Sequence, residues 1–131
     1  MKGIAVIFLL TYSSGVAKMA IKLGTANKDT VIGTSDWDTL YGFAGNDTLS
    51  GGDGNDVLEG GTGADSLFGG AGADVFKYTS FKQAKGDTIA DFSAEDTLDF
   101  SAIAGASFIG NAPFSGVAGQ IRYSITRCSS F

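Results

Sequence analysis

The sequence predicts an all-β fold in which a flattened parallel solenoid is followed by additional β-strands. Three observations predict it. Twelve of the 20 glycines lie between Gly33 and Phe76, eight acidic residues share that stretch with no Lys or Arg, and apolar residues recur there at a fixed spacing. With 131 residues and one proline, the chain fits a single domain and not collagen. Its 44% hydrophobic content argues against a disordered glycine-rich linker.

The composition also excludes several classes of function. The chain contains no histidine, so it cannot form a Ser-His-Asp triad, a Cys-His pair or an HExxH zinc site, and we expect no enzyme activity. Its single cysteine, Cys128, cannot form an internal disulfide. The formal net charge is −5, and an acidic surface repels phosphates, so nucleic acid is not an expected partner.

A nine-residue repeat runs without a gap from Gly24 to Lys77. Its six blocks read GTANKDTVI, GTSDWDTLY, GFAGNDTLS, GGDGNDVLE, GGTGADSLF and GGAGADVFK. Glycine opens every block. Aspartate holds every sixth position, as Asp29, Asp38, Asp47, Asp56, Asp65 and Asp74. An apolar residue holds every eighth position, as Val31, Leu40, Leu49, Leu58, Leu67 and Phe76. Such a period is typical of a solenoid.

The residue types of one block indicate a tight turn followed by a short strand. The strand points one apolar side chain inward, and a single block cannot bury it, so we expect the blocks to stack, two per coil. Successive coils then lie about 4.8 Å apart. The turns require positive φ, which glycine adopts readily. In the first two blocks we expect Asn27 and Asp36 to keep this path, because Asn and Asp tolerate the left-handed region best.

Stacking brings the aspartates of alternate blocks into one row at each edge of the solenoid. Adjacent carboxylates repel, and each raises the pKa of its neighbour. A hard cation between coils removes this repulsion, and calcium takes about six to eight oxygens from carboxylates and backbone carbonyls. We therefore expect calcium between each block and the second block after it. In decreasing order of quality, the pairs are Asp56 with Asp74, Asp47 with Asp65, Asp38 with Asp56, and Asp29 with Asp47.

The predicted metal ligands are these carboxylates together with turn residues whose backbone carbonyls glycine leaves accessible. The main set is Asp38, Gly42, Gly45, Asp47, Gly51, Gly52, Asp53, Gly54, Asp56, Gly60, Gly61, Thr62, Gly63, Asp65, Gly69, Gly70, Ala71, Gly72 and Asp74. Asp29 and Asp36 are weaker candidates, since Lys28 disfavours a cation beside Asp29. The alternative interpretation is that the aspartates only cap their own turns.

The blocks match GGxGxDxUx and resemble the nonapeptide of RTX proteins, the haemolysin-type calcium-binding family. GDTIADFSAEDTLDFSAI (residues 86–103) and FIGNAPFSGVAGQIRY (108–123) resemble the segment after the β-roll in serralysin-type metalloproteases. The resemblance implies a calcium-filled parallel β-roll, export by a type I system and folding outside the cell. It also implies an outlying calcium site at Asp87 and Asp96, which could equally be turn residues.

The predicted function is that of a calcium-binding module, with Ca²⁺ as its only cofactor, which gives calcium-dependent folding and structural support to a secreted, extracellular protein. Two alternatives stay open. One is a non-catalytic fragment of a serralysin-type metalloprotease, since the zinc protease domain is absent, and the other is an extracellular adhesion module. The expected partners are calcium ions and a type I export system or a larger parent protease, with no stable insertion into a membrane.

Three regions are predicted along the chain. They are a signal-like or non-native leader (1–18), the β-roll (19–77) and a trailing β segment (78–131), truncated or frame-altered after about residue 123. The apolar run within the leader is shorter than the roughly 20 residues that span a membrane, but as a helix or strand it could cover the open end of the roll. The aromatic residues expected in the core of the trailing sheet are Phe76, Tyr78, Phe81, Phe92 and Phe100.

Overall fold

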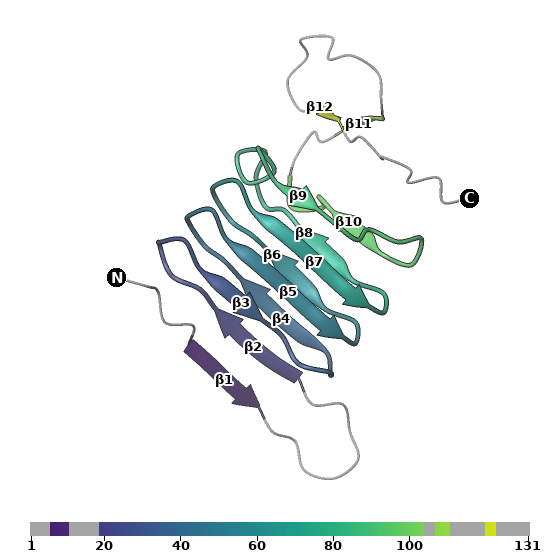
Figure 1. The fold of residues 1–131 in the computed structure, drawn as a ribbon. Helices are drawn as coiled ribbons and strands as arrows, with labels where there is room; N and C mark the ends of the chain where they lie inside the picture. The colour runs from purple at the N-terminus through teal and green to yellow at the C-terminus, as the bar shows by residue number, and fades with distance from the viewer. Residues whose placement is uncertain (1–5, 11–18, 104–106, 111–119, 123–131) are drawn as a thin grey trace, which may run out of the picture.

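The computed structural model describes residues 6–10, 19–103, 107–110 and 120–122, with side chains over 19–103. The fold is the predicted all-β parallel solenoid, with about four turns (Figure 1). One sheet contains β1 (Val6–Leu10), β2 (Met19–Leu23), β4 (Asp38–Tyr41), β6 (Val57–Glu59), β8 (Val75–Lys77) and β10 (Thr97–Asp99). The second sheet contains β3 (Thr30–Ile32), β5 (Thr48–Asp53), β7 (Ser66–Ala71) and β9 (Thr88–Ile89). A separate parallel pair consists of β11 (Ser107–Gly110) and β12 (Gln120–Arg122).

The strand register confirms that two blocks make one coil. In the first sheet, Leu40 pairs with Leu58, and in the second, Leu49 pairs with Leu67, in both cases in parallel and 18 residues apart. Because the chain alternates between the sheets, consecutive blocks turn at opposite edges of the roll. We call the edge whose turns open at Gly24, Gly42 and Gly60 the first edge, and the edge whose turns open at Gly33, Gly51 and Gly69 the second edge.

The core is a single stack made by the eighth position of each block. All six of these side chains are 0% exposed. They are Val31, Leu40, Leu49, Leu58, Leu67 and Phe76. Each fully buried side chain of this kind contributes about 1.5–3 kcal/mol relative to an exposed one. A coil has only two such side chains, so no coil buries its apolar residues without neighbours on the stack.

The nonapeptide register continues beyond Lys77 after four additional residues. Leu67 pairs with Ile89 and Phe76 pairs with Leu98, so β9 and β10 extend the two sheets at a spacing of 22 residues, four more than in the repeat. The residues around them complete the core at this end, where the Tyr78 and Phe100 rings stack at 5.0 Å.

The expectation that Phe76, Tyr78, Phe81, Phe92 and Phe100 are all core residues is only partly right. Phe76, Tyr78 and Phe100 are buried, but Phe81 is 37% and Phe92 is 44% exposed. Phe81 lies in a turn, and Phe92 follows the end of β9, where its ring reaches that of Phe76 at 6.0 Å but stays at the surface. Both fall in the connections of the last coil and not on the inward face of a strand.

At the N-terminal end, β1 pairs antiparallel with β2, with Val6 opposite Leu23. A strand is one of the two forms expected for the leader, and β1 extends the first sheet beyond β2. The rest of the predicted leader, Cys128 and the proposed truncation after about residue 123 lie outside the described residues. The described part of the chain contains no helix long and apolar enough to cross a membrane.

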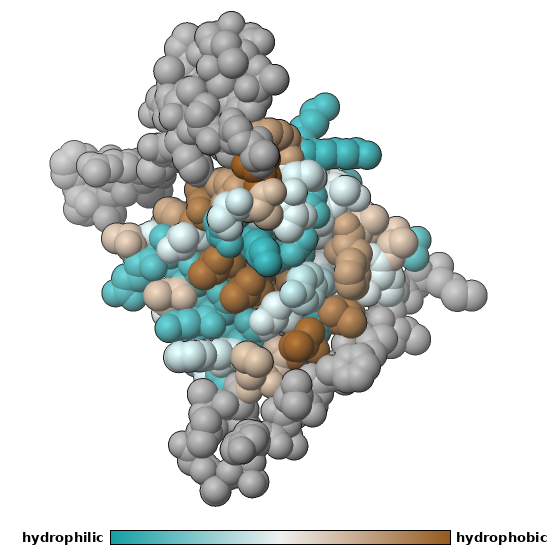
Figure 2. Space-filling model, turned by 180° about the vertical axis from the view of Figure 1, so that it is seen from behind, coloured by the Kyte–Doolittle hydropathy of each residue, from teal (hydrophilic) through white to brown (hydrophobic). Residues whose placement is uncertain are grey.

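The outer faces of the sheets carry mixed side chains. Ile32 is 61% exposed and Phe68 is 39% exposed on the second sheet, where Ser50 lies between them in register. The space-filling view shows hydrophobic side chains in small groups among hydrophilic ones (Figure 2). The chemistry of the repeat is therefore concentrated at the edges and not on the faces.

Candidate metal centre

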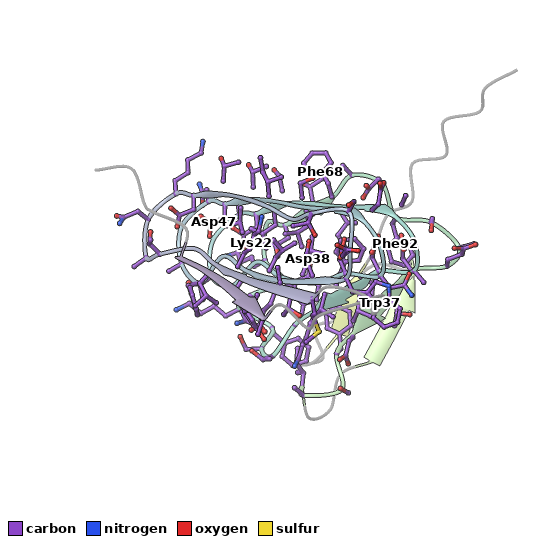
Figure 3. The ribbon with its side chains drawn as sticks, turned by 90° about the horizontal axis from the view of Figure 1, so that it is seen from below. Lys22, Trp37, Asp38, Asp47, Phe68 and Phe92 are labelled. Carbon is purple, nitrogen blue, oxygen red and sulfur yellow. The ribbon has the colours of Figure 1, made fainter. Side chains whose placement is uncertain are left out.

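The repeat aspartates form two columns, one at each edge of the roll. The first-edge column contains Asp29, Asp47, Asp65 and Asp87, and the second-edge column contains Asp38, Asp56, Asp74 and Asp96. The six that belong to the repeat are at most 5% exposed. Figure 3, which shows the roll from below, places the labelled Asp38 and Asp47 inside the outline of the backbone. Six buried carboxylates in so small a core require a specific explanation.

One oxygen of every column carboxylate except that of Asp29 joins neighbouring coils. The Asp47 N–H donates to Oδ1 of Asp65 at 2.8 Å, and the Asp56 N–H donates to Oδ1 of Asp74 at 2.9 Å. Each predicted pair of aspartates is thus brought together in consecutive coils. The direct contact within a pair is a hydrogen bond from backbone to carboxylate.

The columns continue past the repeat. The Asp65 N–H donates to Oδ1 of Asp87, and the Asp74 N–H donates to Oδ1 of Asp96, both at 2.9 Å. Asp87 and Asp96 therefore take the same position as the repeat aspartates. The resemblance had instead implied that they form an outlying pair. The missed signal is that they are nine residues apart, and each is followed two residues later by an apolar residue, Ile89 or Leu98.

Asp91 adds a different contact at the end of the second edge. Its Oδ1 accepts the Gly69 N–H and its Oδ2 accepts the Gly70 N–H, both at 2.9 Å. In the sequence it stands where a block would open with glycine. Its carboxylate therefore satisfies two backbone N–H donors of the last regular turn.

The second oxygen of most column carboxylates has no hydrogen-bond partner although it is buried. This holds for Oδ2 of Asp47, Asp56, Asp65, Asp74 and Asp87. A buried polar atom without a partner costs about 1–3 kcal/mol, and more when it is charged. Several such atoms in a repeated position indicate a ligand common to all of them.

Backbone carbonyls converge on the same space as these oxygens. A Cβ on Gly51 would lie 2.2 Å from Asp56 Oδ2 and 2.5 Å from the Gly69 carbonyl oxygen. A Cβ on Gly42 would lie 2.6 Å from Asp47 Oδ2 and 2.3 Å from the Gly60 carbonyl oxygen. The opening glycine of a block thus leaves room for a carboxylate oxygen of its own block and a carbonyl of the next coil.

The other predicted turn ligands lie along the same edges. The Gly45, Gly52 and Gly54 carbonyl oxygens face the α-carbons of Gly63, Gly70 and Gly72, where a Cβ would approach them to 1.6–2.0 Å. The Thr62 and Ala71 carbonyls each accept a backbone N–H at 2.9 Å, from Gly45 and Gly54 respectively, and retain a second lone pair. The Asp53 side chain is exposed, and its charge raises the pKa of Asp56.

The first two turns differ from the later ones. Oδ2 of Asp29 accepts the Thr25 N–H at 2.5 Å and the Thr25 hydroxyl at 2.7 Å, and Oδ2 of Asp38 accepts the Thr34 N–H. These two carboxylates cap their own turns, as the alternative interpretation of the motif proposes. Oδ1 of Asp29 is nevertheless buried without a partner.

The expectation that Asn27 and Asp36 adopt the left-handed region is wrong. Among the described residues, the only one other than glycine with positive φ is Phe43, at 75°. The physical reason is a different turn, in which the Thr25 and Thr34 hydroxyls accept the N–H groups of Asn27 and Asp36 at 3.2 Å. A threonine hydroxyl closes the turn without positive φ.

In the later four blocks, the second residue of the turn has positive φ. These residues are Phe43 (75°), Gly52 (111°), Gly61 (99°) and Gly70 (99°). The four blocks are also those whose aspartates have an unpartnered Oδ2. Positive φ at the second position, together with positive φ at the fourth-position glycine, therefore separates turns with a free carboxylate oxygen from turns with a self-capped carboxylate.

Burial is the largest cause of the electrostatic perturbation of the columns. It raises the pKa of Asp47, Asp56 and Asp87 to about 6 from 3.8, and raises the pKa of Asp65 and Asp74 as well. The N–H from the preceding coil opposes this shift, while the charges of column neighbours add to it at Asp47 and Asp56. Repulsion within the columns is thus present as predicted, but it is the smaller cause.

The donor set fits a hard cation. In residues 19–103, no three acidic side chains gather into one group, so a bound cation must take much of its coordination from carbonyls. Oxygen-only donors from carboxylates and carbonyls suit calcium and exclude soft metals. The unpartnered Oδ2 atoms and the adjacent backbone carbonyl oxygens are the groups that would bind the cation.

Comparison with known families supports this assignment. The RTX calcium-binding nonapeptide repeat, in four copies, matches residues 23–58 and 50–77. A comparison with curated proteins finds no match to the chain. Residues 23–77, which form the β-solenoid, are thus similar to the RTX nonapeptide repeat, a repeat that binds Ca²⁺ structurally and is typical of secreted proteins.

Proposed function

We propose that this chain is a calcium-folded β-roll module that provides structural support to a secreted protein. The observation that carries the proposal is the set of buried Oδ2 atoms without partners in five consecutive column aspartates, from Asp47 to Asp87. A fold that leaves these atoms uncompensated is costly, and a divalent cation offsets that cost at every coil.

Each part of the repeat has a distinct role in this proposal. The carboxylates of Asp47, Asp56, Asp65 and Asp74 bring negative charge to the ion, while turn carbonyls complete its oxygen shell. The glycines keep the space around those oxygens open. Bound calcium supplies the positive charge that the local sequence lacks, since no Lys or Arg occurs between Gly33 and Phe76.

The proposal links calcium binding to folding. Extracellular calcium modules have dissociation constants of about 0.1–1 mM, so such a site is empty in the cytosol and filled outside the cell. Because the site forms only in the stacked coils, the free energy of binding is free energy of folding. The module then folds where calcium is abundant and gives structural support to the polypeptide to which it belongs.

Calcium titration followed by far-UV circular dichroism tests this function. We expect strand content to rise cooperatively between EGTA and millimolar calcium, while magnesium at the same concentration gives little change, since it demands a smaller octahedral site. The same strand content in EGTA and in calcium would overturn the proposal. Isothermal titration calorimetry on the same sample gives the number of ions per chain.

The finer assignment is that the module is exported by a type I system and derives from a serralysin-type protease. It rests on the resemblance of residues 86–103 and 108–123 to that family. Expression of the chain in cells with and without a type I exporter tests it. Appearance in the medium only with the exporter supports the assignment, and retention in both contradicts it.

A further inference from the structure

The coil that begins the roll departs from the repeat at two positions. β2 pairs with β4 in parallel, so that Ala20 lies opposite Asp38 and Lys22 lies opposite Leu40. Ala20 therefore stands where the second-edge column would continue, and Lys22 stands in the apolar row of the core. Compared with a regular coil, this coil therefore lacks one aspartate and contains one additional lysine.

The Lys22 side chain reaches the end of the second edge. Its Nζ donates to the carbonyl oxygens of Ile32 and Gly33, the latter at 3.4 Å. Figure 3 places the labelled Lys22 inside the outline of the coils, between the labels of Asp47 and Asp38, whereas Phe68 lies outside it. The ammonium thus lies at the edge where the carboxylate column ends.

The same carbonyls have other partners one coil later. The Ser50 carbonyl, which corresponds to that of Ile32, accepts the Gly33 N–H at 2.7 Å. The Gly51 carbonyl, which corresponds to that of Gly33, faces the space beside Asp38 Oδ2, since a Cβ on Gly33 would lie 1.8 Å from the one and 2.7 Å from the other. At the N-terminal end of the roll, the Lys22 ammonium interacts with the Gly33 carbonyl. This carbonyl is equivalent to the one that a cation would contact in later coils.

We propose that the Lys22 ammonium is a built-in cation that fills the first cation position of the second-edge column. This inference rests on the proposed calcium function. An ammonium bonded to carbonyls requires no carboxylate beside it, which accounts for Ala20 in place of aspartate. The first coil therefore joins the roll without calcium, and ion binding starts at the coil after it.

Substitution of both positions converts the first coil into a regular one. The variant A20D/K22L restores the column aspartate and the core leucine, and we expect it to bind one more calcium per chain than the unmodified protein by calorimetry. A20D alone, which leaves the ammonium in place, is the matched control and keeps the original stoichiometry. If A20D/K22L folds in calcium by circular dichroism but binds no additional ion, the proposal is overturned.

A second measurement does not depend on ion counting. In saturating calcium, K22L should raise the rate of amide hydrogen exchange in β2 at least about tenfold, because the Ile32 and Gly33 carbonyls lose a charged donor. K22R keeps a charged donor and should keep the protection of the unmodified protein. Unchanged exchange in K22L overturns the proposal. If the unmodified chain binds no calcium, the proposed function fails. Faster exchange in β2 of K22L would in that case still show that the Lys22 ammonium stabilises this strand.

Discussion

The first two blocks of the repeat and the four that follow use the same aspartate for different purposes. In the first two, Thr25 and Thr34 stand at the second position, and their N–H groups bond Oδ2 of Asp29 and Asp38. In the later four, a residue with positive φ stands there, and Oδ2 of the aspartate is buried without a partner. We infer that the residue four positions before the aspartate, acting with the glycine two positions before it, controls whether Oδ2 of the aspartate caps a turn or is free for an ion.

The largest expected effect comes from removing the charge of a free carboxylate. Asp56→Asn keeps the oxygen that accepts the Asp38 N–H at 2.7 Å but removes the negative charge from the unpartnered Oδ2. We expect calcium affinity to fall about tenfold or more, since a buried charged interaction contributes about 1.5–3 kcal/mol. Calorimetric titration of the purified chain measures it.

Asp38→Asn is the matched control for this change. Asp38 holds the same position in its block, but its Oδ1 accepts the Ala20 N–H and its Oδ2 accepts the Thr34 N–H. Its substitution should change calcium affinity much less than that of Asp56. Equal losses in the two variants would remove the distinction between the two groups of blocks.

The next effect concerns backbone conformation at the second position. Gly70 has φ of 99°, and a Cβ there would approach the Gly52 carbonyl oxygen to 1.9 Å. Gly70→Ala should therefore lower the free energy of unfolding in saturating calcium by about 1–3 kcal/mol, from backbone strain and displacement of that carbonyl. Urea denaturation measures the change.

A substitution at the same position of an early block provides the control for Gly70. Thr34→Ala adds no Cβ and needs no positive φ, because Thr34 is not among the residues with positive φ. It should lose only the hydroxyl that accepts the Asp36 N–H, about 0.5–1.5 kcal/mol. A loss as large as that of Gly70→Ala would show that strain is not what separates the two groups.

Acidity should act in opposite directions on the metal-free and calcium-bound chains. The folded pKa of Asp47, Asp56 and Asp87 is about 6, above the 3.8 of a free aspartate. Between these values the folded chain binds more protons than the unfolded chain, so metal-free stability falls as pH rises from about 4 to about 6. Calcium affinity instead rises over that interval, because the ion competes with those protons.

Circular dichroism and calcium titration at several pH values check this prediction. In buffer freed of metal by a chelating resin, the residual strand content should be higher at pH 4.5 than at pH 7. In saturating calcium, the urea midpoint should instead be lower at pH 4.5 than at pH 7. A metal-free strand content that rises with pH would contradict the assigned burial of the free carboxylates.

Much of the fold can be predicted from the sequence, because the repeat specifies both the inward-facing residue of each block and the number of blocks in a coil. The apolar eighth positions predicted the core from Val31 to Phe76, and the period of nine predicted the coil of two blocks. The departures come from residues outside the strict pattern. Thr25 and Thr34 close their turns by side-chain bonds, and an insertion of four residues hides the register that Asp87 and Asp96 share with the repeat.

The candidate site was predicted less fully than the fold. The sequence indicates which aspartates share a column, since that depends only on spacing. It does not indicate which oxygen of Asp47 or Asp56 bonds the preceding coil and which is free, because that depends on turn geometry. Lys22 was missed for a related reason: its role depends on Ile32 and Gly33, ten and eleven residues away.

The smallest effect, and the most direct test of the comparison, is conversion of an early turn into a late one. Thr34→Gly permits positive φ at the second position, which would free Oδ2 of Asp38 from the backbone donor that now bonds it. We expect calcium affinity to rise a few-fold, because the backbone N–H no longer competes with the ion for this carboxylate oxygen. Thr34→Ala removes the hydroxyl but disfavours positive φ, so it should leave calcium affinity nearly unchanged. If glycine and alanine raise the affinity equally, the threonine hydroxyl and not the backbone conformation controls the site. If neither changes it, the Asp38 carboxylate takes no part in ion binding, and the column begins at Asp56.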